Sequence, residues 1–151
     1  MEHIEYDYGV ESLFEDDYKD AQAYYKRALQ FQDSTQAFSL VFNIASVALE
    51  RYLVALCELY GEEPMNHNFI SLMITVDKLI EVPKELSKEI KSLDRIFGIC
   101  FLDDYFHGTP VEADAVRTLR MCKEVEKLFD QEKLLSVRNA LKCVEQYAEC
   151  N

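Results

Sequence analysis

The segment from Phe38 to Gly61 constrains the fold of this chain more than any other. Apolar residues occupy most of its positions up to Gly61, a residue type that commonly follows the last turn of a helix. Asp33 and Ser34 precede it and provide a break and a cap. A helix that is apolar on nearly every side must be covered by other elements. The sequence therefore predicts a central, mostly buried helix.

The same region argues against a membrane span. The longest uncharged run of the chain, residues 34–49, falls short of the roughly 20 apolar residues that a membrane-spanning helix needs. This run contains the polar residues Gln36, Ser39, Asn43 and Ser46. We therefore expect a buried helix here and no membrane association.

Helical periodicity recurs along the rest of the chain. The spacing of apolar residues predicts a first helix over roughly residues 11–32 and a third helix after a cap at Asn66 or Asn68. Val82 and Pro83 end the third helix. Since proline suits the first position of a helix, Pro83 also opens a fourth.

The fourth helix is predicted to run to about Leu102. The sequence Thr109-Pro110-Val111-Glu112 has the pattern of a capping box, with proline at the first helical position, and it predicts the start of a fifth helix. A last segment repeats the helical pattern. The expected inward stripes are Leu86, Ile90, Leu93, Phe97 and Cys100, then Ala115 or Val116, Leu119, Cys122, Val125 and Phe129, and finally Leu134, Val137, Leu141, Val144 and Ala148.

No segment shows sustained strand alternation, and four Gly and three Pro leave room only for short connections. Short connections favour antiparallel neighbours. We predict an all-α fold, an up-and-down bundle of five to six helices. A chain of 151 residues with 49% hydrophobic residues fits one domain, so we expect an acidic leader over residues 1–13 and a single helical domain over residues 14–151.

The cysteines indicate a reducing compartment. They form no C-x-x-C pair, and their odd number leaves at least one thiol without an intramolecular partner. The first residues also lack the basic and apolar regions of a signal peptide. We expect a cytoplasmic protein with no structural metal, in which Cys57, Cys100, Cys122 and Cys143 lie on apolar helix faces and Cys150 is the fifth cysteine.

The net charge of −12 bears on the choice of partner. Phosphate repels such a surface unless a local basic stripe overrides the repulsion, so we expect no DNA partner. Residues 1–79 hold 14 acids and 5 bases, and the excess is greatest in the first 20 residues. That leader is a candidate partner-seeking segment.

One stretch combines carboxylates, aromatics, an imidazole and turn residues between two predicted helices. His107 follows a predicted helix end and precedes a capped helix start, where its ring and backbone amides would face one ligand. The alternative is a hydrogen-bonding turn histidine beside solvated carboxylates. The ligand-binding candidates in this stretch are Asp103, Asp104, Tyr105 and His107.

A second polar set lies on the central helix. Ser39, Asn43, Ser46 and Glu50 step by four, three and four residues, so they share one narrow face. That face either meets solvent or a polar contact between helices, or it lines a groove in which Asn43 and Glu50 bind a ligand. A buried Glu50 would need a partner.

The best candidate for an anionic partner is a basic stripe on the fourth predicted helix. Its members, Lys84, Lys88, Lys91 and Arg95, again step by four, three and four residues. Glu85 and Glu89 lie beside it, so an ordinary salt-bridged, solvated face is the alternative. A second basic set with the same two interpretations is Arg117, Arg120, Lys123 and Lys127.

Several catalytic signatures are absent from the sequence. It has no E-x-x-H pair of the di-iron bundles, no H-E-x-x-H, no P-loop and no G-x-S-x-G. No strong catalytic motif remains, and we expect neither a metal nor another cofactor.

Three features, taken in order, resemble the HEPN domain family over roughly residues 14–129. They are Ala-Leu-Glu-Arg-Tyr-Leu-Val-Ala-Leu at residues 48–56 in a helix ending at Gly61, then His67 opening Phe69-Ile70-Ser71-Leu72, then Asp104-Tyr105-Phe106-His107-Gly108-Thr109-Pro110 before a final helix pair. The resemblance implies an all-helical bundle, often dimeric. The family includes ribonucleases of toxin and defence systems and non-catalytic modules encoded beside nucleotidyltransferases.

Catalytic members of that family carry Arg, four to six residues and then His. In this chain, Cys100, Phe101 and Leu102 occupy the positions that would need Arg before His107, and eleven residues separate Arg95 from His107. RNA cleavage of the family's kind is therefore not expected. His107 is carried over only as a position near the family's functional loop.

Our leading hypothesis is a non-catalytic HEPN-like module that binds a protein partner. That partner is a second copy, giving a homodimer, or a nucleotidyltransferase-type protein, and a nucleotide-like ligand is expected near residues 103–109. The alternative is a degenerate ribonuclease in a toxin or defence system, with His107 as acid or base and Arg95 stabilising the transition state on RNA. A third hypothesis, a purely structural assembly domain, requires an exposed apolar helix face.

Overall fold

Helices make up every regular element that the structure, a computed structural model, describes. The described residues are 13–97 and 110–149. The helices are α1 (Phe14–Asp33), α2 (Phe38–Leu59), α3 (Phe69–Leu79), α4 (Lys84–Ser92), α5 (Asp94–Phe97), α6 (Glu112–Glu126) and α7 (Gln131–Glu149). Because the short α5 continues α4 after a single residue, these form a bundle of six helices, and the predicted all-α fold is confirmed.

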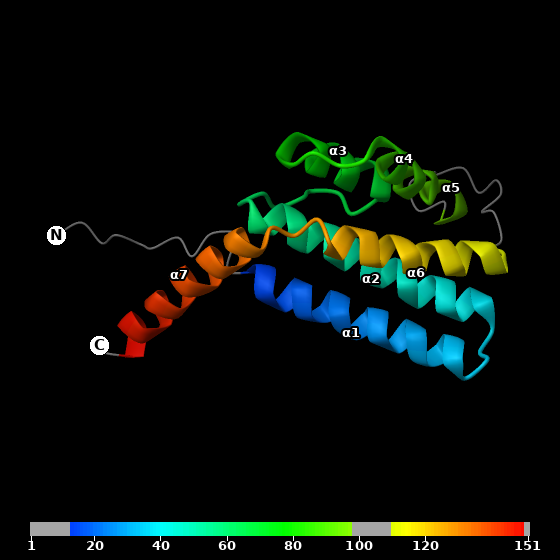
Figure 1. Ribbon diagram of the computed structural model, residues 1–151, viewed down its shortest axis with the longest axis horizontal. Helices are drawn as coiled ribbons and strands as arrows, with labels where there is room; N and C mark the ends of the chain where they lie inside the picture. Colours follow the sequence, from blue (N-terminus) through cyan, green and yellow to red (C-terminus); the bar gives the residue numbers. More distant parts are fainter. Residues whose placement is uncertain (1–12, 98–109, 150–151) are drawn as a thin grey trace.

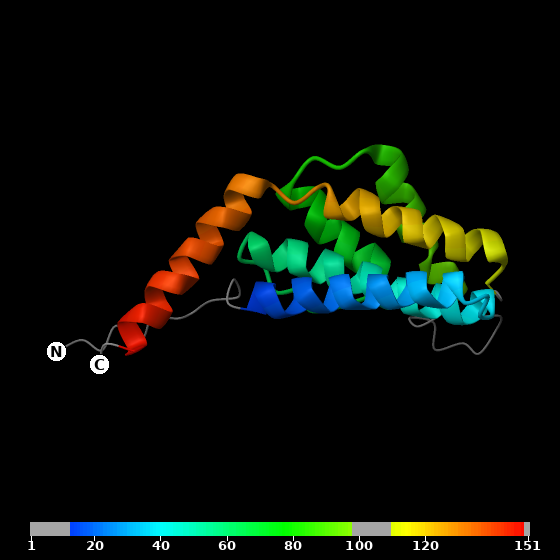
Figure 2. The same cartoon turned by 60° about the horizontal axis from the view of Figure 1, so that its bottom comes forward.

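The central element of the bundle is α2. It lies between α1 and α6 and also contacts α3, and Figures 1 and 2 show α1, α2 and α6 running side by side. Every residue from Tyr52 to Leu59 is buried. By length and composition α2 is the one described helix that could cross a membrane, but 67% of its most apolar window is buried inside the bundle. The prediction of a buried central helix is confirmed.

An aromatic cluster joins one end of α2 to its neighbours. The rings of Phe14 and Tyr18 on α1 have centroids 5.4 Å apart, and Tyr18 meets Tyr52 of α2 edge to face at 6.1 Å. Phe129, just after α6, packs on Tyr18 at 5.0 Å. Edge-to-face contacts of this kind stabilise a core beyond the area that they bury. The Tyr52 hydroxyl donates a 2.8 Å hydrogen bond to Glu126, and burial together with this carboxylate raises the Tyr52 pKa.

α3 and α4 form a hairpin that two polar side chains hold at its open end. The Asn68 side chain caps α3 by accepting a 2.8 Å hydrogen bond from the Ser71 amide, as one of the two predicted caps. The Asp94 carboxylate accepts the Phe69 and Ile70 amides, both at 2.9 Å. Asp94 follows α4, so its carboxylate ties the end of α4 to the start of α3.

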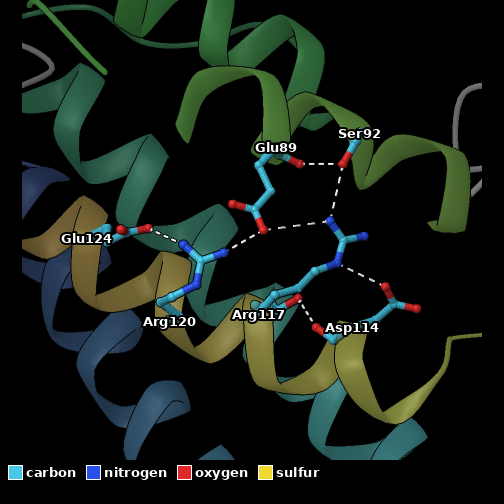
Figure 3. A network of polar contacts seen from close by, with 7 residues as sticks. Glu89, Ser92, Asp114, Arg117, Arg120 and Glu124 are labelled. Atoms are coloured by element: carbon cyan, nitrogen blue, oxygen red, sulfur yellow. Dashed lines mark hydrogen bonds and ion pairs between the residues drawn. The ribbon is translucent and has the colours of Figure 1, made fainter. Parts of the chain in front are cut away.

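Figure 3 shows the polar network that attaches α4 to α6. Glu89 of α4 pairs with Arg120, and Arg117 donates to Ser92 Oγ at 3.3 Å and to Asp114 at 2.9 Å. Arg120 also pairs with Glu124 at 2.7 Å. These contacts hold one side of α4 on the bundle, so its other side is the one that faces away from α6.

α7 departs from the bundle at an angle, and Figures 1 and 2 both show its last turns clear of the other helices. Leu134 and Val137 are buried and Leu141 is partly buried, as the stripe predicted. Arg138 anchors the first turns of α7 to the bundle by pairing with Glu15 of α1. Leu135, by contrast, is 60% exposed. Val144 and Ala148 lie on this helix, but their side chains are outside the description.

Two helix boundaries differ from the prediction. The fourth helix is interrupted at Leu93, so α4 ends at Ser92, and the stretch after Phe97 is outside the described residues. Pro83 is the residue before α4, not its first position.

The predicted capping box is also corrected. α6 begins at Glu112, and the carboxylate that reaches back belongs to Asp114, which accepts the Val111 amide at 2.9 Å. Pro110 precedes the helix, and Thr109 lies outside the described residues. A carboxylate at the third helical position satisfies a free amide in the same way as in the predicted box, two residues later in the sequence.

Side-chain placement settles two further points. Ala115 is the buried member of the predicted pair, since Val116 is 53% exposed. Cys57 and Cys122 are buried thiols, and burial raises the pKa of both, that of Cys57 to about 12. Cys143 is exposed, so its expected place on an apolar face is wrong. Cys100 and Cys150 lie outside the described residues.

Replacement of Asp94 by alanine should destabilise the fold. It removes both acceptors from the first amides of α3, and we expect the free energy of unfolding to fall by about 2 to 3 kcal/mol. Asp94→Asn keeps one acceptor and should cost about half as much. Urea denaturation followed by circular dichroism measures both. The exposed Asp20 of α1 provides the control Asp20→Ala, and equal stability of Asp94→Ala and this control would contradict the proposed cap.

Candidate functional site

The predicted ligand loop lies outside the part of the chain that the structure describes. Asp103, Asp104, Tyr105 and His107 all fall within residues 98–109, so their roles stay predictions. The polar stripe on α2 is described, and its members diverge in environment. Asn43 is exposed, Ser46 is buried, and Glu50 is half-buried.

Glu50 has a partner of its own. His67 Nδ1, from the turn before α3, lies 3.0 Å from Glu50 Oε1. This contact ties the entry of α3 to α2, which agrees with a polar contact between helices. The same contact occupies the carboxylate that the ligand-groove interpretation would need.

A groove of about 790 Å³ runs along α3 and α4, and we take it as the candidate functional site. Figure 1 shows these two helices on one side of the bundle. All four members of the predicted basic stripe line this groove: Lys84, Lys88, Lys91 and Arg95. The other lining residues are Ile70, Asp77, Val82, Ser87, Ser92 and Asp94.

The two carboxylates of the groove are already engaged. Asp77 pairs with Lys91 at 3.3 Å and accepts the Ser87 hydroxyl at 2.9 Å. Asp94 accepts the α3 amides described above. Lys84, Lys88 and Arg95 are exposed and form no ion pair with any other described residue. Three cations of the groove are therefore available to an anionic ligand.

The second basic set has a different environment. Arg117 and Arg120 are bound to carboxylates of α4 and α6 in the network of Figure 3. Lys123 and Lys127 are exposed on the far turns of α6 and beyond. The alternative interpretation, an ordinary salt-bridged face, is therefore correct for Arg117 and Arg120.

An apolar surface accompanies the cations of the groove. Ile70 on α3 is 44% exposed and Val82 is half-buried in the connection before α4. Ile74, one turn after Ile70, is also exposed. Exposed apolar side chains beside charged ones are typical of surfaces that bind a partner. Ile70 and Ile74 were not predicted as surface residues, because they fall outside the apolar spacing that predicts the third helix.

A smaller groove of about 360 Å³ lies at the end of the bundle where α1, α2 and α6 meet. Its apolar lining includes Phe38, Val41 and Ala115. No basic side chain is among its described lining residues. It offers shape but little charge, and the α3–α4 groove is the better candidate.

A partly buried polar cluster lies between α1 and α2. Asp17 of α1 accepts a 3.1 Å hydrogen bond from Arg51. Glu58 is only 1% exposed, and burial, a hydrogen bond to Asp17 and the charges of Asp17 and Glu63 raise its pKa to about 9, against the opposing effect of Arg51. These effects favour the protonated form of Glu58 over the ionised form. Substrate cannot reach a carboxyl so deeply buried, and the cluster is structural.

Within residues 13–97 and 110–149, no group of His, Cys, Asp or Glu side chains could hold a metal ion. Comparison with protein-family models, with curated proteins and with solved structures finds no match to this chain. The case for function therefore depends on the chemistry of the groove.

Glu58→Gln should stabilise the protein at alkaline pH. The folded pKa of Glu58 lies above its unfolded value, so its contribution to stability is complete below about pH 4.5 and is lost as the pH rises toward 9. Glutamine stays neutral and avoids this loss. We expect it to raise the free energy of unfolding by about 1 to 3 kcal/mol at pH 8 and to leave it nearly unchanged at pH 4.

Urea denaturation at about pH 4, 6 and 8 measures this difference in the free energy of unfolding, because these values span most of the range over which Glu58 titrates. Glu81→Gln, at an exposed position before α4, is the matched control. A constant difference between Glu58→Gln and the native protein at all three values would show that Glu58 is ionised in the fold.

Proposed function

We propose that this chain is a non-catalytic HEPN-like helical module that binds a protein partner through the α3–α4 groove. The observation that carries the proposal is a set of three cations, Lys84, Lys88 and Arg95, that form no ion pair with any described residue and lie beside exposed apolar side chains. The protein as a whole carries a net charge of −12, so this groove is a local exception to an acidic surface. Local charge of this kind steers an oppositely charged partner.

Two features support the HEPN-like part of the proposal. The residues that resemble the family begin with a buried central helix that ends before Gly61, and the next helix begins just after His67. All described elements are helical. The third feature, at residues 104–110, lies mostly outside the described residues.

The sequence before His107 favours the non-catalytic form. Arg95 lines the α3–α4 groove, and the positions nearer to His107 that would need arginine hold other residue types. Cys57 and Cys122 are buried free thiols, and the sequence has no C-x-x-C pair. Both observations suit a reducing cytoplasm, and we include this compartment in the proposal.

A degenerate ribonuclease is the second candidate, because Arg95 is exposed and unpaired among the described residues. An RNA-cleavage assay on the purified protein, with His107→Ala and Arg95→Ala, tests it. Robust cleavage that both substitutions abolish would replace the binding-module proposal.

Charge reversal in the groove should release the partner. We expect the double variant Lys84→Glu/Lys88→Glu to lose a protein that copurifies with the native chain, because both side chains then repel its acidic surface. Native mass spectrometry of the chain isolated from its own host counts subunits and partners in one spectrum. The same spectrum distinguishes a homodimer from a complex with a second protein.

The matched control is Lys26→Glu/Lys142→Glu, which changes the net charge equally at exposed positions on α1 and α7. Thermal unfolding of each variant checks that the fold is kept. If the control and the groove variant retain the same partner to the same extent, the groove is not the binding site.

A further inference from the structure

The chemistry of the α3–α4 groove also limits the class of its partner, on the premise that the proposed function is correct. From Lys84 to Arg95 the chain advances eleven residues through α4, the turn at Leu93 and the start of α5, which corresponds to at most about 16 Å of helical rise. One phosphate or carboxylate group cannot meet cations spread over that length. The ligand must therefore carry several anionic groups in a line.

The remaining lining residues distinguish between polyanions. Ile70 and Val82 are the apolar side chains among the described residues that line the groove. They offer aliphatic contacts, which suit apolar side chains of a peptide, whereas single-stranded nucleic acids gain much of their affinity from bases that stack on aromatic rings.

The arrangement of these contacts favours a helical ligand. Ile70 lines the groove, and the exposed Ile74 lies one turn further along α3 but is not among the lining residues. Lys84 and Lys88 line the groove one turn apart on α4. The groove and the α3 surface next to it therefore present apolar and cationic side chains, each with helical spacing. An amphipathic helix of about three turns matches this length and presents apolar and acidic side chains on adjacent faces.

We propose that the α3–α4 groove binds an acidic amphipathic helix of a partner protein. Its apolar side chains pack on Ile70, Ile74 and Val82, and its carboxylates pair with Lys84, Lys88 and Arg95. Asp77 and Asp94 do not oppose this binding strongly, because Lys91 and the α3 amides already offset their charge. The polar network of Figure 3 holds α4 in place on the opposite side.

The test uses the full chain and fluorescein-labelled synthetic helical peptides of about 16 residues. One peptide carries leucine on one face and glutamate on the adjacent face. The second replaces glutamate by lysine, and the third replaces leucine by serine. Fluorescence anisotropy at about 50 mM and about 300 mM NaCl gives each affinity and its dependence on salt.

We expect the acidic amphipathic peptide to bind ~10-fold or more tightly than either of the other two. Its affinity should fall at higher salt and drop ~10-fold or more in Lys84→Glu/Lys88→Glu. Lys26→Glu/Lys142→Glu should bind it like the native chain. The variant Ile70→Ser should also weaken binding while thermal unfolding shows a folded protein, since the side chain is partly exposed.

Several outcomes would overturn the inference. One is an absence of saturable binding below about 1 mM peptide, and another is equal or tighter binding of a single-stranded oligouridylate. A third is displacement of the probe by a peptide of residues 1–12, which would assign the groove to the acidic leader of this chain. A fourth is a homodimer that dissociates in Lys84→Glu/Lys88→Glu, which would assign it to a second copy.

These failures differ from failure of the proposed function. If charge reversal releases the host partner but the acidic peptide does not bind, the groove is a binding site for another class of ligand. If the peptide binds while the host partner is retained by the groove variant, the partner uses another surface.

Discussion

The structure depends on the need of α2 to remove apolar surface from water on nearly all sides. No single neighbour can cover such a helix, so α1, α6 and α3 each take part of its circumference. The aromatic cluster closes one end of this arrangement, and the partly buried Asp17 and Arg51 lie between α1 and α2 with the buried Glu58. Once α2 is covered in this way, the sides of α3 and α4 that face away from the bundle remain as exposed surface for binding.

Carboxylates distinguish the two basic sets of this chain. Arg117 and Arg120 meet the acidic side chains of α4 and α6, and their charge serves the attachment of one helix to another. Lys84, Lys88 and Arg95 meet no such partner among the described residues. A basic stripe in a sequence is therefore informative only after its neighbours in space are known. Here α4 turns Glu89 toward the arginines of α6 and presents Lys84 and Lys88 at the groove.

Much of the fold was predictable from the sequence, because helical spacing of apolar residues survives in a soluble bundle. The central helix, the Asn68 cap and the buried face of α6 through Leu119 and Val125 all followed from local pattern. The break at Leu93 and the projection of α7 did not, since contacts between distant residues decide them. Only part of the groove was predictable: its cations form a stripe in the sequence, but the exposure of its aliphatic side chain on α3 could not be predicted. Exposure of Ile70 depends on which face α3 turns to the bundle.

The bond between Asp94 and the start of α3 has one more consequence. The carboxylate and the Phe69 amide are 25 residues apart in sequence, so this contact closes the hairpin into a non-covalent ring. If α4 separates from α3, the first amides of α3 lose their acceptor. The two helices should then open as one cooperative unit, and the hydrogen exchange of both should be slowed together by anything that clamps either of them. The turn that carries His67 lies at this same end of the hairpin, two residues before the Phe69 amide that Asp94 accepts.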